Sequence, residues 1–246
     1  MGKWFKRLVI AGVVLIVLLL GAVILIPVLF KDKIEVLVKE QVNANINATV
    51  EWGEWDITLL KSFPDLTVDV ANVKVCNKAP FEGVCLADIG ALTTTIDIKS
   101  LFGDRIDIKR IGLTRPKIHA AVLEDGRGNW DIALPDTAPT PTTDTAAKFT
   151  IGLREYWIED GHVIYDDASL AMRMDLAGLD HKGTGDFTQD LFTLSTTTHA
   201  DTVDVTFDGI RYLKRAVVDI KADLDMDMPN MKFTFKENEA TINQLS

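Results

Sequence analysis

The feature that most constrains this sequence is a long uncharged run near its start. From Leu8 to Phe30 no residue is charged and almost all are apolar. As a helix this run measures roughly 34 Å, whereas the hydrocarbon core of a bilayer is roughly 30 Å thick. A cleaved secretory signal is the alternative, but its apolar region is about 7–15 residues long and is followed by a small-residue cleavage site. The run is longer and ends in apolar residues, so we expect an uncleaved transmembrane helix.

The residues that flank this run set the expected topology. Lys3, Lys6 and Arg7 form a short basic tail before it, which is typical of a cytoplasmic N-terminus, although lysines also follow the run. The rest of the chain is then expected outside the cytoplasm. Apolar residues recur at steps of three and four through residues 31–47, which predicts a short amphipathic helix directly after the membrane helix.

Beyond residue 47 the hydrophobic period changes to two, which is typical of strands with one buried and one wet face. Leu66, Val68 and Val70 alternate with polar residues, and the phase slips at residues 71–72, which indicates a bulge. The longest run extends from Val218 to Met228. Shorter runs lie at 96–99, 106–113, 118–122, 149–153, 156–165, 172–176, 203–207 and 231–235. We expect Asp160-Gly161 to divide one run into two strands.

These patterns predict a mainly β fold with a twisted antiparallel sheet, because no helical pattern of useful length follows residue 47. Residues 135–147 are rich in proline and threonine and lack large apolar side chains, so they are expected to form an extended linker. The predicted organisation is a cytoplasmic tail and membrane helix (1–30), a first β module (31–134), the linker (135–147) and a second strand-rich segment (148–246).

The apolar faces of these strands must be covered. Two faces packed against each other would form a sandwich, which is the commoner solution. Alternatively, the sheet curls into an open groove whose apolar face holds acyl chains. Since burial of a methylene group contributes about 0.8 kcal/mol, a lipid tail is a favourable cover for such a face.

Composition and motifs exclude several classes of function. The net charge of -10 disfavours binding to nucleic acid, because the phosphate backbone is also negative. The sequence carries no strong catalytic motif, so we expect no enzymatic activity, no cofactor and no metal. The four histidines lack partners at metal-ligand spacing, and the aspartate row on the longest strand is interpreted as a solvated face. These residues are His119, His162, His181, His199, Asp219, Asp223, Asp225 and Asp227.

Two further features leave alternatives open. The chain has only two cysteines, Cys76 and Cys85, whose spacing suits a disulfide-closed hairpin in an oxidising compartment but equally suits two buried thiols. Tyr165-Asp166-Asp167 places a carboxyl group where a general acid is conceivable, although carboxylates after a strand usually shape a turn.

Several segments together resemble the N-terminal part of AsmA-family proteins of Gram-negative inner membranes. They are the membrane helix and the helix after it, LLKSFPDLTVDVANVKV (59–75), the stretch 77–132, the Thr/Pro linker, IEDGHVIYDD (158–167) and KFTFKENEATIN (232–243). The resemblance implies an N-terminal module similar to that of bridge-like lipid-transfer proteins, followed by a periplasmic β-groove with an apolar interior. Family members are usually longer, so this chain is expected to be a short member or an N-terminal portion.

The resemblance also implies which residues contact lipid and which are structural. It assigns phospholipid acyl chains to the apolar face of the matched strands, to which we add two residues of the longest run. The resulting set is Leu66, Val68, Val70, Ile96, Ile98, Ile106, Ile108, Ile220 and Leu224. Asn129-Trp130-Asp131 matches a turn of the family and is expected to be structural.

The expected function is therefore support of outer-membrane biogenesis by binding or passing phospholipid, with effects on protein targeting to the membrane. The alternative is an anchored scaffold for outer-membrane assembly proteins, which predicts a closed sandwich that binds no lipid.

Overall fold

The computed structural model describes residues 39, 42–44, 46–59, 61–102, 105–134, 148–150 and 152–243, without the side chains of 101–102, 105–106 and 148–150. The chain divides into two compact units, Met1–Asn45 and Ile46–Ser246. The predicted membrane helix, Leu8–Phe30, lies outside the described residues. Within the described ranges, no helix is long and apolar enough to cross a bilayer. Of the predicted amphipathic helix, Lys39 and residues 42–44 are described and are helical.

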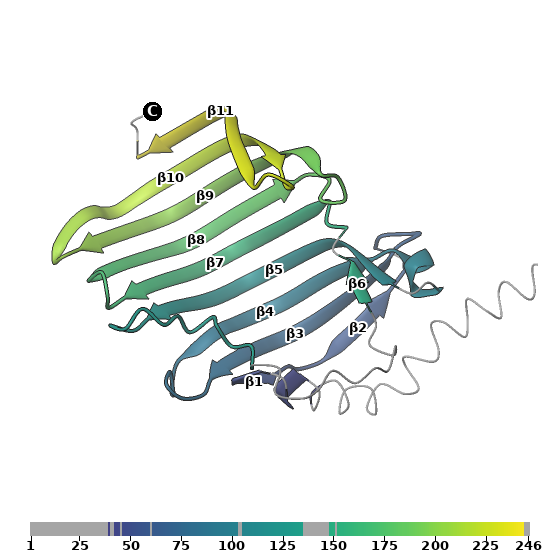
Figure 1. Ribbon diagram of the computed structural model, residues 1–246, viewed down its shortest axis with the longest axis horizontal. Coiled ribbons are helices and arrows are strands. Elements are labelled where there is room, and N and C mark those ends of the chain that lie inside the picture. Colours follow the sequence, from purple (N-terminus) through teal and green to yellow (C-terminus); the bar gives the residue numbers. More distant parts are fainter. Residues whose placement is uncertain are drawn as a thin grey trace, which may run out of the picture. The chain divides into compact units, whose positions relative to one another are not determined.

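The second unit is built from strands, as the period of two predicts. Its elements are β1 (Ala48–Glu51), β2 (Trp55–Thr58), β3 (Leu66–Asn77), β4 (Cys85–Ile96), the short 3₁₀ helix η1 (Ile98–Phe102), β5 (Arg105–Val122), β6 (Lys148–Thr150), β7 (Glu155–Asp167), β8 (Met172–Thr184), β9 (Leu191–Phe207), β10 (Ile210–Asp227) and β11 (Lys232–Ile242). The long strands lie side by side in one twisted layer (Figure 1). The expectation of a mainly β fold is confirmed.

All the strands belong to one sheet with the order β1-β3-β4-β5-β7-β8-β9-β10-β11, while β2 pairs with β3 and β6 with β5. Neighbours are antiparallel except at β5, which pairs in parallel with both β6 and β7. The parallel pairs at β5 differ from the antiparallel sheet that the sequence predicts. Because β5 and β7 are neighbours, the segments on the two sides of residues 135–147 share one continuous sheet.

Local irregularities of the backbone differ in part from those that the sequence predicts. Asn72 has a φ of 53° at the phase slip, but the pairs Ala71–Ala91 and Val73–Ile89 keep one register, so the predicted bulge is not present there. The register shift between β3 and β4 lies between Val75 and Cys76. Asp160-Gly161 does not separate two strands. Strand β7 continues through a register shift between Ile158 and Gly161, with Asp160 at a φ of 51°, so the expected turn is a bulge. Ile98 likewise begins η1 and does not extend strand β4.

The described strands form one layer and not two, so the closed sandwich is wrong. Contacts between elements join strands that are neighbours in the sheet, or β5 and η1. Apolar side chains of adjacent strands pack laterally into two clusters, one around Val73 and Ile89 and the other around Leu179 and Val203. The sheet therefore buries part of its apolar surface through lateral contacts between neighbouring strands. No second layer of described strands covers the rest of that surface.

Two connections tie the first strands together. A disulfide joins Cys76, near the end of β3, to Cys85 at the start of β4. Asn129 follows β5 and is only 1% exposed. Its side chain accepts a hydrogen bond from the Ala121 amide and donates one to the His119 carbonyl, which fixes the turn that the family resemblance marked as structural.

Candidate functional site

The candidate site is an apolar face that extends from β3 to β11. Strand register shows which side chains share it, because directly opposed residues point to the same side of a sheet. Val70 of β3 lies opposite Leu92 of β4, which lies opposite Leu113 of β5, and that residue lies opposite Ile158 of β7. The face continues across β8, β9, β10 and β11 through the pairs Met174–Val205, Val205–Leu213, Leu194–Leu224 and Leu224–Phe235. At about 4.8 Å per strand spacing, this face is about 34 Å wide.

The structure brings most of the candidate lipid-contacting residues to this face. Leu66 lies opposite Ile96, and Ile96 lies opposite Ile108. Val68 and Val70 follow Leu66 at steps of two along β3, so their side chains point the same way. These residues come from three strands that are separated in sequence but adjacent in space.

Ile220 and Leu224 lie on the same face at its far end. They are opposite Thr198 and Leu194 of β9. Ile98 differs, because it belongs to η1 and not to a strand of the face. The side chain of Ile106 lies outside the described residues.

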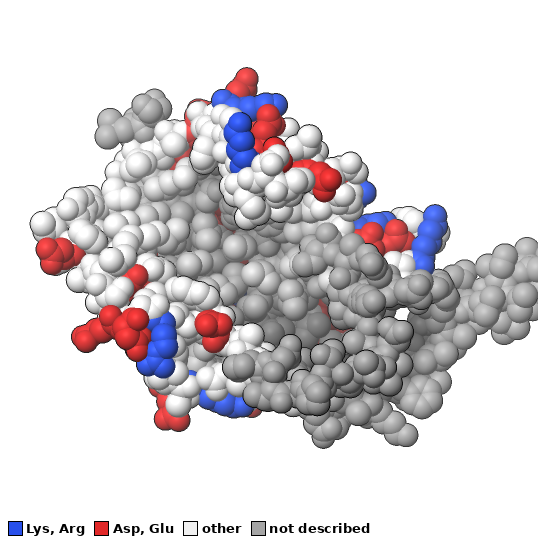
Figure 2. Space-filling model, in the orientation of Figure 1, with Lys and Arg blue, Asp and Glu red and all other residues white. Residues whose placement is uncertain are grey.

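Exposure of the apolar face increases toward the C-terminal edge of the sheet. Leu66 is 8% exposed, whereas Ile220 is 37%, Phe233 47% and Phe235 65% exposed. Figure 2 views this side, where charged side chains lie mainly at the margins and the surface between them is uncharged. We did not nominate Phe233 and Phe235, although their alternation with Lys232 and Thr234 was the signal that would have found them. The accessible apolar surface therefore concentrates on β10 and β11.

A small polar group interrupts this apolar face. His181 of β8 hydrogen-bonds through Nδ1 to the Thr198 hydroxyl at 2.8 Å, and its Nε2 lies 3.4 Å from the Tyr156 hydroxyl. Burial lowers the pKa of His181 and raises that of Tyr156, because both charged forms lose solvation. Both groups are therefore uncharged at neutral pH. They provide hydrogen-bonding atoms within the face without placing a charge there.

The opposite face of the sheet is polar and carries paired charges. Examples are Lys182 with Glu155 at 2.6 Å and Arg173 with Asp166 at 2.8 Å. The charged residues of β10 from Asp219 to Asp227 alternate with Ile220 and Leu224, so they lie on this polar side and not on the apolar face. The two sides of the sheet thus differ in chemistry, as the alternation predicted.

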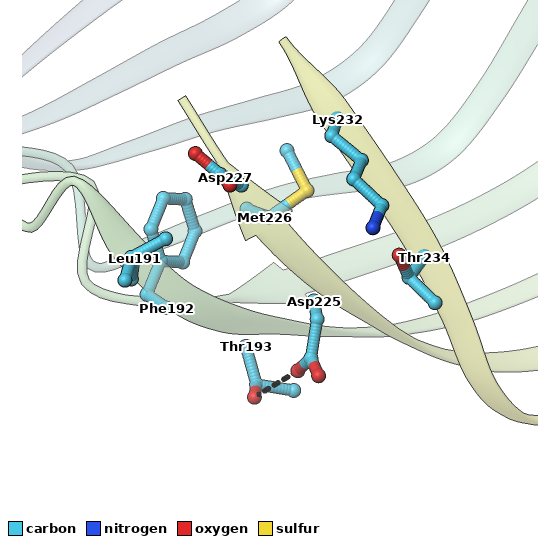
Figure 3. Close-up of a pocket in the computed structure, with 8 residues that line it drawn as sticks. All are labelled: Leu191, Phe192, Thr193, Asp225, Met226, Asp227, Lys232 and Thr234. Carbon is cyan, nitrogen blue, oxygen red and sulfur yellow. Dashed lines mark hydrogen bonds between the residues drawn. The ribbon is translucent and has the colours of Figure 1, made fainter. Parts of the chain in front are cut away.

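A hollow of about 430 Å³ lies on β9, β10 and β11 and includes Asp225 (Figure 3). Asp225 accepts a hydrogen bond from the Thr193 hydroxyl at 2.8 Å and pairs with Lys236 at 2.9 Å. The bond from Lys236, followed by that from Thr193, holds the pKa of the Asp225 carboxyl below its usual range. The Asp225 carboxylate therefore has hydrogen-bond and ion-pair partners and stays ionised at neutral pH. This state is typical of a structural residue and not of a proton donor.

The carboxylate after β7 shapes a turn. Asp167 is 4% exposed and accepts hydrogen bonds from the Ser169 and Tyr165 hydroxyls and from the Leu170 amide. These bonds, with that from Ser169 the strongest influence, lower the pKa of Asp167. These hydrogen bonds support the interpretation that the carboxylates of Tyr165-Asp166-Asp167 shape a turn. In the part of the chain that the structure describes, no group of three acidic, histidine or cysteine side chains has a metal-binding arrangement.

Comparison with known protein families gives one match. The family model described as AsmA family matches residues 1–237, which is nearly the whole chain. Neither the curated proteins nor the solved structures give a match. The family model spans the described strands from β1 to β10 and much of β11. The chain belongs to the AsmA family.

Proposed function

We propose that this protein binds phospholipid acyl chains along the apolar face of its sheet and thereby supports outer-membrane biogenesis. Family membership and an open β-sheet are consistent with this role. The observation that carries the proposal is that apolar side chains of β3 to β11 share one face, whose C-terminal part is accessible at Ile220, Phe233 and Phe235.

The proposed mechanism is passive and requires no covalent step. Each methylene group that leaves water for this face contributes about 0.8 kcal/mol, which is also the gain on entering a bilayer. An acyl chain can therefore exchange between the bilayer and the face with little net change in free energy. Movement along the face is equally undemanding, because apolar contacts are non-directional.

The proposed location follows from the sequence of the N-terminal segment. The run from Leu8 to Phe30 would anchor the chain in the inner membrane with its N-terminus in the cytoplasm. The sheet would then lie in the periplasm, where the Cys76–Cys85 disulfide is chemically favoured. In the periplasm the apolar face would receive phospholipid from the inner membrane that anchors the protein. Protein targeting to the outer membrane would then depend on the phospholipid that this protein delivers.

The test compares both faces of strand β10 and its neighbour β11. The full chain is purified in mild detergent, and co-purifying phospholipid is quantified by mass spectrometry. We expect the double substitution Ile220→Asn and Phe235→Asn to reduce bound phospholipid at least fivefold. The matched control is Lys221→Asn with Lys232→Asn, which changes the same two strands on their polar side and should leave the bound phospholipid unchanged.

Two outcomes would contradict lipid binding at this face. One is a folded wild-type protein that carries no phospholipid. The other is an equal loss of phospholipid in both double variants, because binding would then not depend on the apolar side chains. Circular dichroism of each variant establishes that the sheet remains folded.

The alternative function is a scaffold for outer-membrane assembly proteins. Strand β11 favours it, because it is the last strand of the sheet order and nearly all of its residues are exposed. A partner strand could pair with such an edge. Site-specific crosslinking from Thr234 in intact cells would detect a protein partner, whereas the lipid-binding role predicts that phospholipid is captured from Phe235.

A further inference from the structure

The polar face of the sheet carries a second hollow, which the lipid-binding role does not use. It measures about 680 Å³ and lies over β5, β7, β8 and β9. This size falls within the usual range of pockets for small ligands, about 300–1,000 Å³. Trp157 of β7 lines it and supplies its largest aromatic ring, beside the imidazoles of His181 and His199. Trp157 is a large apolar ring on a face of charged and hydroxyl groups. The residues around it therefore indicate which class of ligand the hollow binds.

The indole ring of Trp157 lies flat against the neighbouring strand β5. It lies opposite Gly112 of β5. A Cβ atom at Gly112 would be 2.1 Å from both Cε2 and Cζ2 of the indole and 2.6 Å from its Nε1. Such nearly equal distances to ring atoms place the Cβ position beneath the face of the ring and not at its edge. One face of the indole therefore rests on a strand that has no side chain at this point, and the same ring lines the hollow.

Strand register surrounds this ring with both hydrogen-bond donors and acceptors. Lys182 of β8 lies opposite Trp157, and Thr197 of β9 lies opposite Lys182. Arg110 of β5 and Glu155 of β7 are opposed to each other two residues away on the same face. Acidic groups complete the other side, with Glu159 and Asp180 among the lining residues. The hollow thus combines a flat apolar floor with mixed polar walls.

Two of the donors are available to a ligand. Within the described ranges, neither the Arg110 guanidinium nor the Trp157 indole N–H has a hydrogen-bond or ion-pair partner. Arginine carries five N–H donors in a fixed plane, so it is well suited to bind several oxygen atoms of one ligand. By contrast, Lys182 is paired with Glu155 at 2.6 Å, and that pair forms a fixed part of the wall.

These features select one class of ligand by its chemistry. A polyanion would meet the carboxylates of Glu155, Glu159 and Asp180, and a polycation would meet Arg110 and Lys182. An acyl chain is disfavoured as well, because it would remove water from these charged groups without offering them hydrogen bonds. A pyranose sugar has a flat patch of C–H groups that stacks on an aromatic ring, and hydroxyls around its rim that both donate and accept. We infer that the Trp157 hollow is a binding site for a hexopyranose unit of a glycan.

Most residues of this site point to the opposite side of the sheet from the lipid-binding face, although Ile158 and His181 of the apolar face also line it. Each strand alternates between the two faces, as Trp157 and Ile158 show on β7. A chain that holds lipid on one face and sugar on the other could remain close to a glycan-bearing surface while lipid moves along it. The inference does not depend on the proposed lipid binding.

The test uses the full chain in mild detergent and three uncharged tetrasaccharides, cellotetraose, maltotetraose and chitotetraose. Saturation-transfer NMR identifies any that bind, and titration calorimetry gives the dissociation constant. We expect at least one of them to bind, and Trp157→Ala and Arg110→Ala each to weaken its binding at least tenfold. Trp157→Phe, which keeps an aromatic floor, should weaken it less than Trp157→Ala. Lys221→Asn, on the same polar face but outside this hollow, is the matched control and should bind like the wild type.

The inference is overturned if none of the three sugars binds the wild-type chain. It is also overturned if binding survives both Trp157→Ala and Arg110→Ala, or if inorganic phosphate displaces the sugar, since the hollow would then be an anion site. Arg110→Ala leaves the indole packing intact, so it remains informative if Trp157→Ala does not fold. Co-purifying phospholipid should be unchanged in Arg110→Ala, which separates failure of this site from failure of the lipid-binding face.

Discussion

Replacement of Asn129 by alanine tests the reasoning about buried polar groups most directly. This residue is 1% exposed, and its side chain satisfies two backbone groups of β5. Oδ1 accepts from the Ala121 amide at 2.9 Å, and Nδ2 donates to the His119 carbonyl at 2.8 Å. Nδ2 also lies 3.3 Å from the Oδ1 of Asn77, a residue of β3. The side chain therefore joins the turn after β5 to two strands.

The expected magnitude follows from the groups that the substitution leaves unpaired. Alanine offers neither a donor nor an acceptor, so the Ala121 amide and the His119 carbonyl lose their side-chain partner in a buried setting. A buried group without a partner costs about 1–3 kcal/mol. Two such groups predict a decrease of about 2–6 kcal/mol in the free energy of unfolding, a large part of the stability of an ordinary domain.

Urea unfolding of the full chain in mild detergent, followed by far-ultraviolet circular dichroism, measures this difference. Asp131→Ala is the matched control, because Asp131 lies in the same turn but is exposed. We expect the control to remain within about 0.5 kcal/mol of the wild type, as is usual for exposed positions. If Asn129→Ala were also within that margin, the reasoning about its hydrogen bonds would be wrong.

Four further predictions concern titration and covalent links. Burial holds the pKa of folded His181 below its ordinary 6.5, so the free energy of unfolding should fall as pH drops below 6.5, and His181→Gln should reduce that slope. Hydrogen bonds to Asp219 and then Asp201 raise the pKa of His199, so its contribution to stability should be present below pH 6.5 and lost as pH rises through the folded pKa. Urea titrations across pH measure both effects, and His199→Gln should abolish the second. Asp167→Asn should destabilise the chain at neutral pH, and the difference from the wild type should narrow as pH falls below 3.8, because the lowered pKa of Asp167 adds stability only above that range; a constant difference would contradict this. Reduction of Cys76–Cys85, which closes a loop with a sequence separation of 9, should lower the free energy of unfolding by about 2–3 kcal/mol, whereas a variant with serine at both positions should not respond to the reductant.

Local patterns in the sequence predicted parts of the long strands and the sides to which their residues point, although they did not reveal β1, β2 or most of β4 and β9. The alternation of β10, with Val218, Ile220 and Leu224 on one side, is present in the structure as expected. The phase slip at residues 71–72 coincides with the positive φ of Asn72, although no register shift occurs there. The sides were predictable because side chains of a strand alternate strictly, so a break in the pattern indicates a local change in the backbone.

Predictions failed where local sequence was ambiguous. Ile98 continues the alternation of Ile96, yet it begins η1, because a pattern of two residues does not distinguish a strand from a short 3₁₀ turn. Asp160-Gly161 has the composition of a turn, but the chain continues as β7 with a bulge. Pairing with both neighbouring strands holds β7 extended, and this pairing is not visible in the local sequence.

The sequence by itself determined that this chain has long strands, each with one apolar and one polar side. Only the tertiary structure decided that β5 and β7 are parallel neighbours, that the strands form one layer, and that Trp157 rests on Gly112. The physical reason is the range of the interactions. Alternation is a property of neighbouring residues, whereas strand order, register and the cover of a face depend on contacts between residues that are distant in the chain.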